Sequence, residues 1–159
     1  MAEADDPMAE GMPPEVALLV QLLKFATLLN RPMSDAVATP EGVSPNELRV
    51  LMALGGERQA AGHALAELIG MQPMNVSRAL AGLHARGWVE QVEDASNRRR
   101  KPFRLSAAGW AAHEAMTPEM KAVADFIFAD LTAAERTRLD RIVEKMIRRT
   151  TAWEKPAGA

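Results

Sequence analysis

Apolar residues recur every three or four positions in the middle of the chain. Between residues 73 and 85 they follow the i, i+3, i+4, i+7 rhythm of one buried helix face: Val76, Ala79, Leu80 and Leu83. Pro73 suits the first turn of this helix, and Gly87 suits a cap beyond its end. A shorter apolar stretch at residues 65–69 ends at Gly70, which supplies the small residue of a tight turn. The pattern therefore predicts a pair of helices joined by a short turn.

The opposite face of the second helix is polar. It carries four side chains that can hydrogen-bond a base edge or a phosphate: Gln72, Asn75, Ser77 and Arg78. Strand-forming residues follow at 88–92 and 103–105, which predicts a hairpin. The loop of this hairpin and the strand after it add five basic candidates for DNA contact: Arg98, Arg99, Arg100, Lys101 and Arg104. A polar helix face beside a basic hairpin is typical of a winged helix-turn-helix, which reaches a major groove and an adjacent minor groove.

Further helices are predicted on both sides of this segment. Ser44 and Glu47 form a capping box, as do Thr132 and Glu135, so a helix is expected to begin at each. A long helix is expected from about residue 107 to residue 131, with a kink rather than a break at Pro118.

The first and last helices carry more apolar surface than one chain of this length can bury. Residues 16–29 are apolar almost all round, so we expect a partner subunit to cover the second side. The last helix has one apolar face. The predicted dimer interface comprises Val16, Leu19, Val20, Leu23, Leu139, Ile142, Val143, Met146 and Ile147.

These elements predict a mainly α fold with a small β-hairpin wing. We expect residues 1–12 to form a disordered acidic tail and residues 13–40 a dimerisation helix. Residues 44–106 are expected to form the winged helix-turn-helix. Residues 107–153 are expected to form a long kinked linker helix and a C-terminal dimerisation helix.

Composition adds a charge asymmetry to this picture. The 159-residue chain has a formal net charge of −2. Residues 71–105, however, hold seven Lys and Arg against three Asp and Glu, whereas the first fifteen residues hold five acidic residues and no basic one. Such asymmetry favours a polyanionic partner for the middle segment, namely double-stranded DNA.

Several classes of function are disfavoured. The chain has no cysteine, which excludes disulfides and thiolate metal sites. The three histidines are scattered, and no nucleophile–base pair, paired carboxylates or glycine-rich phosphate loop stands out. We therefore expect no enzyme activity, no metal and no cofactor. The acidic start is unlike a signal peptide, and no apolar run is expected to approach the roughly 20 residues of a membrane span. These features predict a soluble cytoplasmic protein with no membrane partner.

The central segment resembles the MarR family of bacterial transcription regulators. The family wing usually reads D-x-x-D-R-R and ends in L-T-x-x-G. Here Asn97 stands where the second Asp is typical, and Ser106 stands where the Thr is typical. The matching segments are residues 65–68, 76–78, 83–89, 94–99 and 105–109.

This resemblance implies a homodimer whose first and last helices intertwine and whose winged domains bind pseudo-palindromic promoter DNA, often as a repressor. It also implies release by a small aromatic or phenolic ligand between the two regions, where Met52, Trp110 and His113 are candidate lining residues. Two alternatives stay open: a winged-helix module for protein contacts, and a DNA-binding regulator without a small-molecule response.

Overall fold

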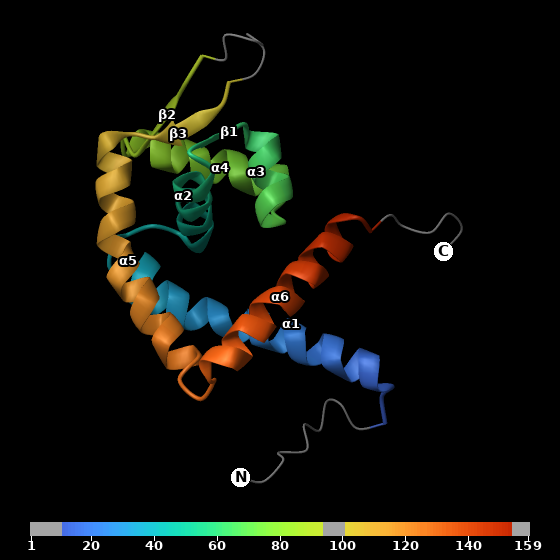
Figure 1. Ribbon diagram of the computed structural model, residues 1–159. Coiled ribbons are helices and arrows are strands. Elements are labelled where there is room, and N and C mark those ends of the chain that lie inside the picture. The colour runs from blue at the N-terminus through green and yellow to red at the C-terminus, as the bar shows by residue number, and fades with distance from the viewer. Residues whose placement is uncertain (1–10, 94–100, 154–159) are drawn as a thin grey trace.

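The computed structural model describes residues 11–93 and 101–153, which form six α-helices and a small antiparallel sheet (Figure 1). In chain order the elements are α1 (Pro14–Met33), the π-helical turn η1 (Ser34–Ala38), α2 (Pro45–Glu57), β1 (Gln59–Ala60), α3 (Gly62–Ile69), α4 (Pro73–Ala85), β2 (Val89–Gln91), β3 (Phe103–Leu105), α5 (Ala107–Ile127) and α6 (Ala133–Thr151). The predicted fold class is confirmed. Residues 1–10, most of the predicted acidic tail, lie outside the described residues, as do the wing residues Arg98, Arg99 and Arg100.

The sheet has the strand order β1-β3-β2, so β3 is central. Val89 pairs with Leu105 and Glu90 pairs with Arg104 across the hairpin. The strand β1 was not predicted, because two residues are too short to show an alternating pattern. It pairs Gln59 with Arg104 and so closes the sheet on its other side.

The core lies in the winged domain, defined here as α2 to β3. All four residues of the predicted apolar stripe of α4 are buried, together with Leu51, Leu54 and Leu65 from α2 and α3. Val89 and Leu105 cover this core from the sheet. Because the apolar stripe is buried, the rotation of α4 about its own axis is fixed, and its polar face points toward solvent.

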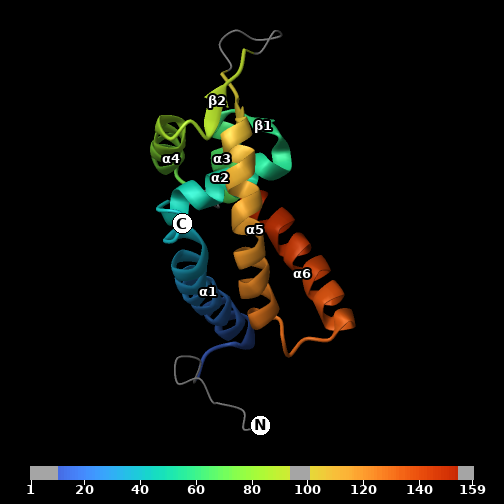
Figure 2. The same cartoon turned by 90° about the vertical axis from the view of Figure 1, so that its left-hand side faces the viewer.

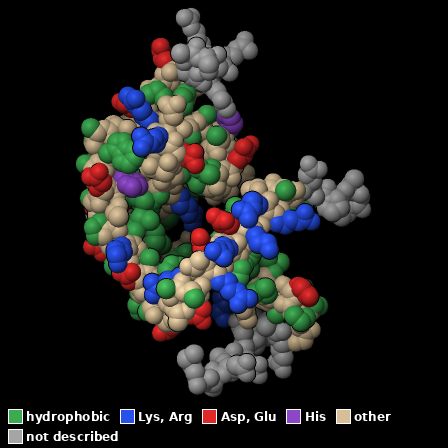
Figure 3. All heavy atoms as spheres, in the orientation of Figure 1, with side chains coloured by type: hydrophobic (Ala, Val, Ile, Leu, Met, Phe, Trp, Pro, Cys, Tyr) green, Lys and Arg blue, Asp and Glu red, His purple; other side chains and the backbone are tan. Residues whose placement is uncertain are grey.

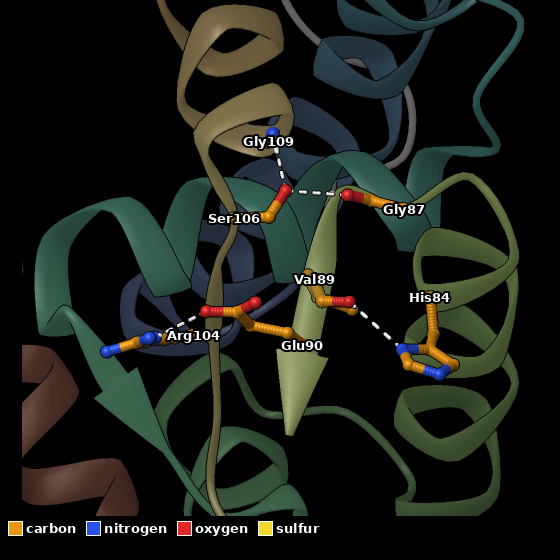
Figure 4. Close-up of polar contacts among 7 residues, drawn as sticks. All are labelled: His84, Gly87, Val89, Glu90, Arg104, Ser106 and Gly109. Carbon is orange, nitrogen blue, oxygen red and sulfur yellow. Dashed lines mark hydrogen bonds and ion pairs between the residues drawn. The ribbon is translucent and has the colours of Figure 1, made fainter. Parts of the chain in front are cut away.

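Local hydrogen bonds begin the helices where the sequence predicted. The Glu47 N–H donates to Ser44 Oγ at 3.2 Å, and the Ser44 N–H donates to Glu47 Oε2 at 2.7 Å. Thr132 and Glu135 form the same box at the start of α6. The hydroxyl of Ser106 accepts from the Gly109 N–H and donates to the Gly87 carbonyl, which joins the start of α5 to the end of α4 (Figure 4).

The first helix passes through Pro32 without stopping and continues as η1, within the expected range of residues 13–40. The long helix α5 also passes through Pro118 unbroken, but it ends at Ile127 rather than near Leu131. Leu131 keeps the apolar spacing although it lies beyond the helix, because it is half-buried in the turn. The helix ends before it because Thr132, the N-cap of α6, needs an extended backbone.

Helix α1 extends away from the winged domain, and α6 runs back toward it from the far end of α5, so the two form arms on either side of α5 (Figure 2). Neither arm buries a residue within this chain. Residues Pro14–Ala38 are also long and apolar enough to span a membrane by length and composition, with a mean hydropathy of 1.2. The expectation that no stretch would reach this length is therefore wrong. A long apolar helix is equally what a subunit interface requires.

Candidate nucleic-acid interface

The solvent-facing side of α4 presents the predicted polar residues. Ser77 and Arg78 are exposed, Asn75 is half-buried, and Gln72 is the exposed N-cap residue. Within residues 11–93 and 101–153 no ion pair engages Arg78. A guanidinium held on a rigid helix without a partner carboxylate is available to a base edge or a phosphate.

The start of α4 suits an anion. Gln72 makes no side-chain capping hydrogen bond, and Pro73 occupies the first turn. The first N–H groups of a helix have no partner within it, and the helix dipole places partial positive charge there. A phosphate close to Gln72 would accept hydrogen bonds from these N–H groups and would be stabilised by the partial positive charge.

Gly82 serves packing inside the domain. A Cβ at Gly82 would lie 2.1 Å from Glu47 Oε1, so the absent side chain lets α2 approach α4. The side chain of Glu47 occupies the space that a side chain at Gly82 would need, while the neighbouring Ala81 is exposed.

A hollow of about 480 Å³ lies beside α4, between α3 and the sheet. His63, Ser77, His84 and Gln91 supply its polar lining, and Phe103 is part of its apolar lining. His84 Nδ1 lies 3.0 Å from the Val89 carbonyl oxygen (Figure 4). A carbonyl oxygen only accepts, so Nδ1 donates in this hydrogen bond.

Arg104 and Lys101, the basic residues in the described part of the wing, have different surroundings. Arg104 Nε lies 2.7 Å from Glu90 Oε1 in an ion pair across the strands (Figure 4). Arg104 and Leu105 lie on different faces of the sheet, because successive side chains of a strand point to opposite faces. Lys101 is exposed before β3. Arg104 is thus less available to DNA than the sequence suggested, while Lys101 has no ion pair with another described residue.

A larger cavity of about 690 Å³ lies where α1 meets the winged domain. Its lining is mostly apolar and comes from α1, η1, α2, α3 and α5: Ala26, Leu29, Asn30, Met33, Ser34, Pro45, Leu48, Arg49, Met52, Ala53, Gly56, Glu57, Leu68, Ile69 and Met120. Arg49 Nη2 donates to Asn30 Oδ1 at 2.6 Å, and both residues belong to this lining. Figure 3 shows the molecule hollowed between the winged domain and α6, with hydrophobic side chains beside the hollow.

Of the three predicted ligand residues, Met52 alone is in this lining. Trp110 and His113 instead form an edge-to-face pair on α5, with ring centroids 5.6 Å apart. His113 packs on α2, where a Cβ at Gly55 would lie 2.4 Å from its Nε2. The sequence reasoning missed Arg49 and Asn30, because nothing in the pattern shows that residues 19 positions apart meet.

No group of three or more metal-binding side chains comes together in the described ranges 11–93 and 101–153. The exposed face of α4, the basic hairpin and the apolar arms are the candidate functional features of the chain.

Residues 41–100 match the sequence model of the MarR family. These residues are therefore similar to a MarR-family domain. The match runs from the turn before α2 into the wing, and so contains α4 and the start of the basic loop. No curated protein matches the sequence.

Solved structures extend the likeness to nearly the whole chain. A MarR-family transcriptional regulator from Silicibacter pomeroyi is 25% identical with a TM-score of 0.71, over 89% of this chain and 93% of that one. A MarR mutant from E. coli, solved with operator DNA, is 19% identical with a TM-score of 0.70, over 83% and 95%. BpsR from Bordetella bronchiseptica, whose DNA binding is regulated by 6-hydroxynicotinic acid, is 21% identical with a TM-score of 0.70, over 81% and 98%. The chain thus has the fold of MarR-family transcriptional regulators.

Proposed function

We propose that this protein is a DNA-binding transcription regulator that acts as a homodimer on pseudo-palindromic promoter DNA, as a repressor. The observation that carries the proposal is α4. Its stripe of four apolar residues (Val76, Ala79, Leu80 and Leu83) is buried, while Arg78 projects from the opposite side without an ion pair among the described residues. The match to the MarR family and the E. coli structure with operator DNA support it.

The two arms support the proposed dimer. Large apolar side chains of α1 and α6 are left at the surface, among them Leu23 at 61% exposed and Ile147 at 57%. Contiguous apolar surface of this kind marks an interface. A second copy that covers α1 and α6 would form a dimer base and present two α4 helices to one side of the duplex.

The same proposal gives the wing its role and the protein its location. Arg98, Arg99, Arg100 and Lys101 would meet the minor groove and its flanking phosphates, where cationic side chains are favoured. Because the target is genomic DNA, we place the protein in the cytoplasm and α1 in the dimer base rather than a membrane.

The cavity between α1 and the winged domain supports a response to a small ligand. It lies where filling it would change the angle between the dimer base and α4, and so the distance between the two α4 helices. Its apolar wall suits an aromatic ring, and Arg49 can pair with a carboxylate. The proposed effector is therefore an aromatic acid, held by Met52 and Arg49, that weakens DNA binding.

Selection of binding sequences from random DNA tests the DNA-binding proposal. We expect enrichment of a two-fold symmetric site, with half-site centres about one helical turn apart. Affinity for this site should fall steeply with salt, because phosphate contacts release counterions. No enrichment and no salt-dependent binding would overturn the proposal and favour the alternative, a winged-helix module for protein contacts.

A panel of aromatic acids, with 6-hydroxynicotinic acid included, tests the ligand response. The expected result is a higher melting temperature and weaker operator binding with at least one acid. Arg49→Gln should lose both effects, whereas Trp110→Ala, outside the cavity, should keep them. A panel without effect, or an effect that survives Arg49→Gln, would leave a DNA-binding regulator without this ligand site.

A further inference from the structure

Met74 is exposed on the same surface as Arg78. Its side chain is 65% exposed, although the other apolar residues of α4 with large side chains are buried. It lies in the first turn of α4, after Pro73. A single exposed apolar residue is ordinary on a protein surface. The neighbours of Met74 on the helix make its position informative.

Helix geometry aligns Met74 with three other residues. Positions 74, 78, 81 and 85 follow the i, i+4, i+7, i+11 spacing of one helix face, and all four are exposed. Two of them, Ala81 and Ala85, are small. They leave the backbone of α4 free to come close to a surface, with Met74 and Arg78 as the two long side chains that reach it.

Other roles for the Met74 side chain find no support in the fold. It belongs neither to the buried core nor to the half-buried apolar residues packed on it, which include the nearby Met71. Helix α1 and the start of α6 lie at the other end of the molecule from α4 (Figure 1). A dimer formed through these arms would leave Met74 exposed.

The chemistry of Met limits what it can contact in a major groove. Its thioether is a weak acceptor and donates nothing, so it cannot read the hydrogen-bonding groups of a base well. The methyl group of thymine is the apolar feature of the major groove, and an apolar side chain distinguishes it. The three rotatable bonds of Met let it adapt to the methyl position.

We propose that Met74 is a specificity-determining residue that reads a thymine methyl group in the major groove beside the base contacted by Arg78. This inference rests on the proposed function, since it needs α4 to enter DNA. Side chains four positions apart on a helix are separated by about 5–6 Å, and successive bases by about 3.4 Å. The thymine therefore lies within about two base steps of the Arg78 contact.

Replacing thymidine by deoxyuridine tests the proposed methyl contact directly, because deoxyuridine differs from thymidine only by the missing methyl group. Each thymine of one half-site in the selected sequence is replaced in turn, and wild-type affinity is measured by titration. One replacement should weaken binding about fourfold, as expected for one methyl-sized group left unburied. The other replacements should have no effect.

Variants identify the side chain responsible. Met74→Ala should bind the thymine and deoxyuridine sites equally, whereas Met74→Leu, which keeps an apolar side chain of similar size, should still distinguish them. Met12→Ala removes an exposed Met outside the winged domain and should keep the full fourfold difference. Circular dichroism and affinity for random DNA verify that each variant is folded.

Two results would overturn the proposal. Wild-type protein that binds every deoxyuridine site as tightly as the thymine site has no methyl contact. A fourfold difference that persists in Met74→Ala assigns the contact to another residue. In both cases the proposed function stands, because a site was selected. Failure to select any DNA would remove the proposed function and the Met74 contact together.

Discussion

Gly109 shows how a single residue determines the junction between the winged domain and α5. A Cβ at this position would lie 1.9 Å from the Trp88 carbonyl oxygen. That oxygen already accepts the Ser106 N–H at 3.0 Å, so it is fixed by the same turn. The hydroxyl of Ser106 binds both Gly87 and Gly109 nearby. The absence of a side chain at Gly109 is therefore a packing requirement.

We predict that Gly109→Ala destabilises the protein despite its higher helix propensity. Overpacking against backbone atoms costs about 2 kcal/mol or more, which exceeds the gain of about 1 kcal/mol from replacing a helical glycine. Chemical denaturation measures the difference.

Gly56→Ala is the matched control, because a Cβ there meets nothing within 4 Å. It should leave stability unchanged or raise it by about 0.5 kcal/mol. If the two variants are equally stable, the close approach at Gly109 is not as described.

At the residue scale, sequence reasoning works best for interactions between neighbours in the chain. Both capping boxes are predictable from the sequence, since each joins residues three apart. The hydrogen bond between Arg49 and Asn30 is not, because it joins two helices. Met74 escapes notice because a Met near an apolar stripe is usually interpreted as part of the core.

Among the elements, α4 and the wing are expected to contribute differently to DNA binding. Contacts to phosphates and to groove width act on most sequences, whereas a contact to a base edge discriminates between them. The ion pair between Arg104 and Glu90 shifts the wing's contribution toward the loop.

Substitutions in the two elements should therefore have different consequences. Arg98→Ala with Arg99→Ala should weaken binding to selected and random DNA alike, and should flatten the salt slope by about one unit for each phosphate that is no longer neutralised. Arg78→Ala should cost about 1–3 kcal/mol on the selected site and relax the preference at one position in each half-site. Titrations of both variants at several salt concentrations separate these effects.

Lys121→Ala on α5 removes a positive charge outside the proposed interface and should leave affinity and slope unchanged. An unchanged slope in the wing variant would make the basic loop a solvated hairpin tip. The DNA-binding proposal would then lose one of its two elements.

For the whole molecule, the apolar faces of α1 and α6 remain exposed in a single chain. Neither helix buries a residue, and the exposed side chains include all of the predicted interface except the half-buried Val20. Figure 3 also shows Lys and Arg side chains along α6, so this helix is polar on its other side. A helix with one apolar and one charged face packs on a partner through the apolar one.

We predict that Ile142→Asp with Met146→Asp gives a monomer or a poorly folded chain. Buried carboxylates without partners are costly, so the interface should not form. Loss of the second half-site should reduce operator affinity at least about a hundredfold, which is the lower end of the gain from linked binding. Light scattering and operator titration measure the two effects.

Ala134→Asp with Thr137→Asp adds the same charge on the exposed polar side of α6 and should remain dimeric. A wild-type protein that is monomeric and still binds its operator tightly would contradict the proposed dimer base.

The sequence by itself determined which side of each helix is apolar and where the capped helices begin. Both follow from interactions within a few residues, which periodicity and residue type record directly. It also indicated the mainly helical fold with a small sheet, because the predicted elements could bury their apolar faces only against one another.

The tertiary structure decided what each face meets. It placed Glu47 against Gly82, paired Arg104 with Glu90, added β1 to the sheet, and separated Trp110 and His113 from the cavity that contains Met52. These contacts depend on the distances and crossing angles between elements that are far apart in the chain. A pattern along the sequence records the periodicity of one element at a time, and so it cannot contain them.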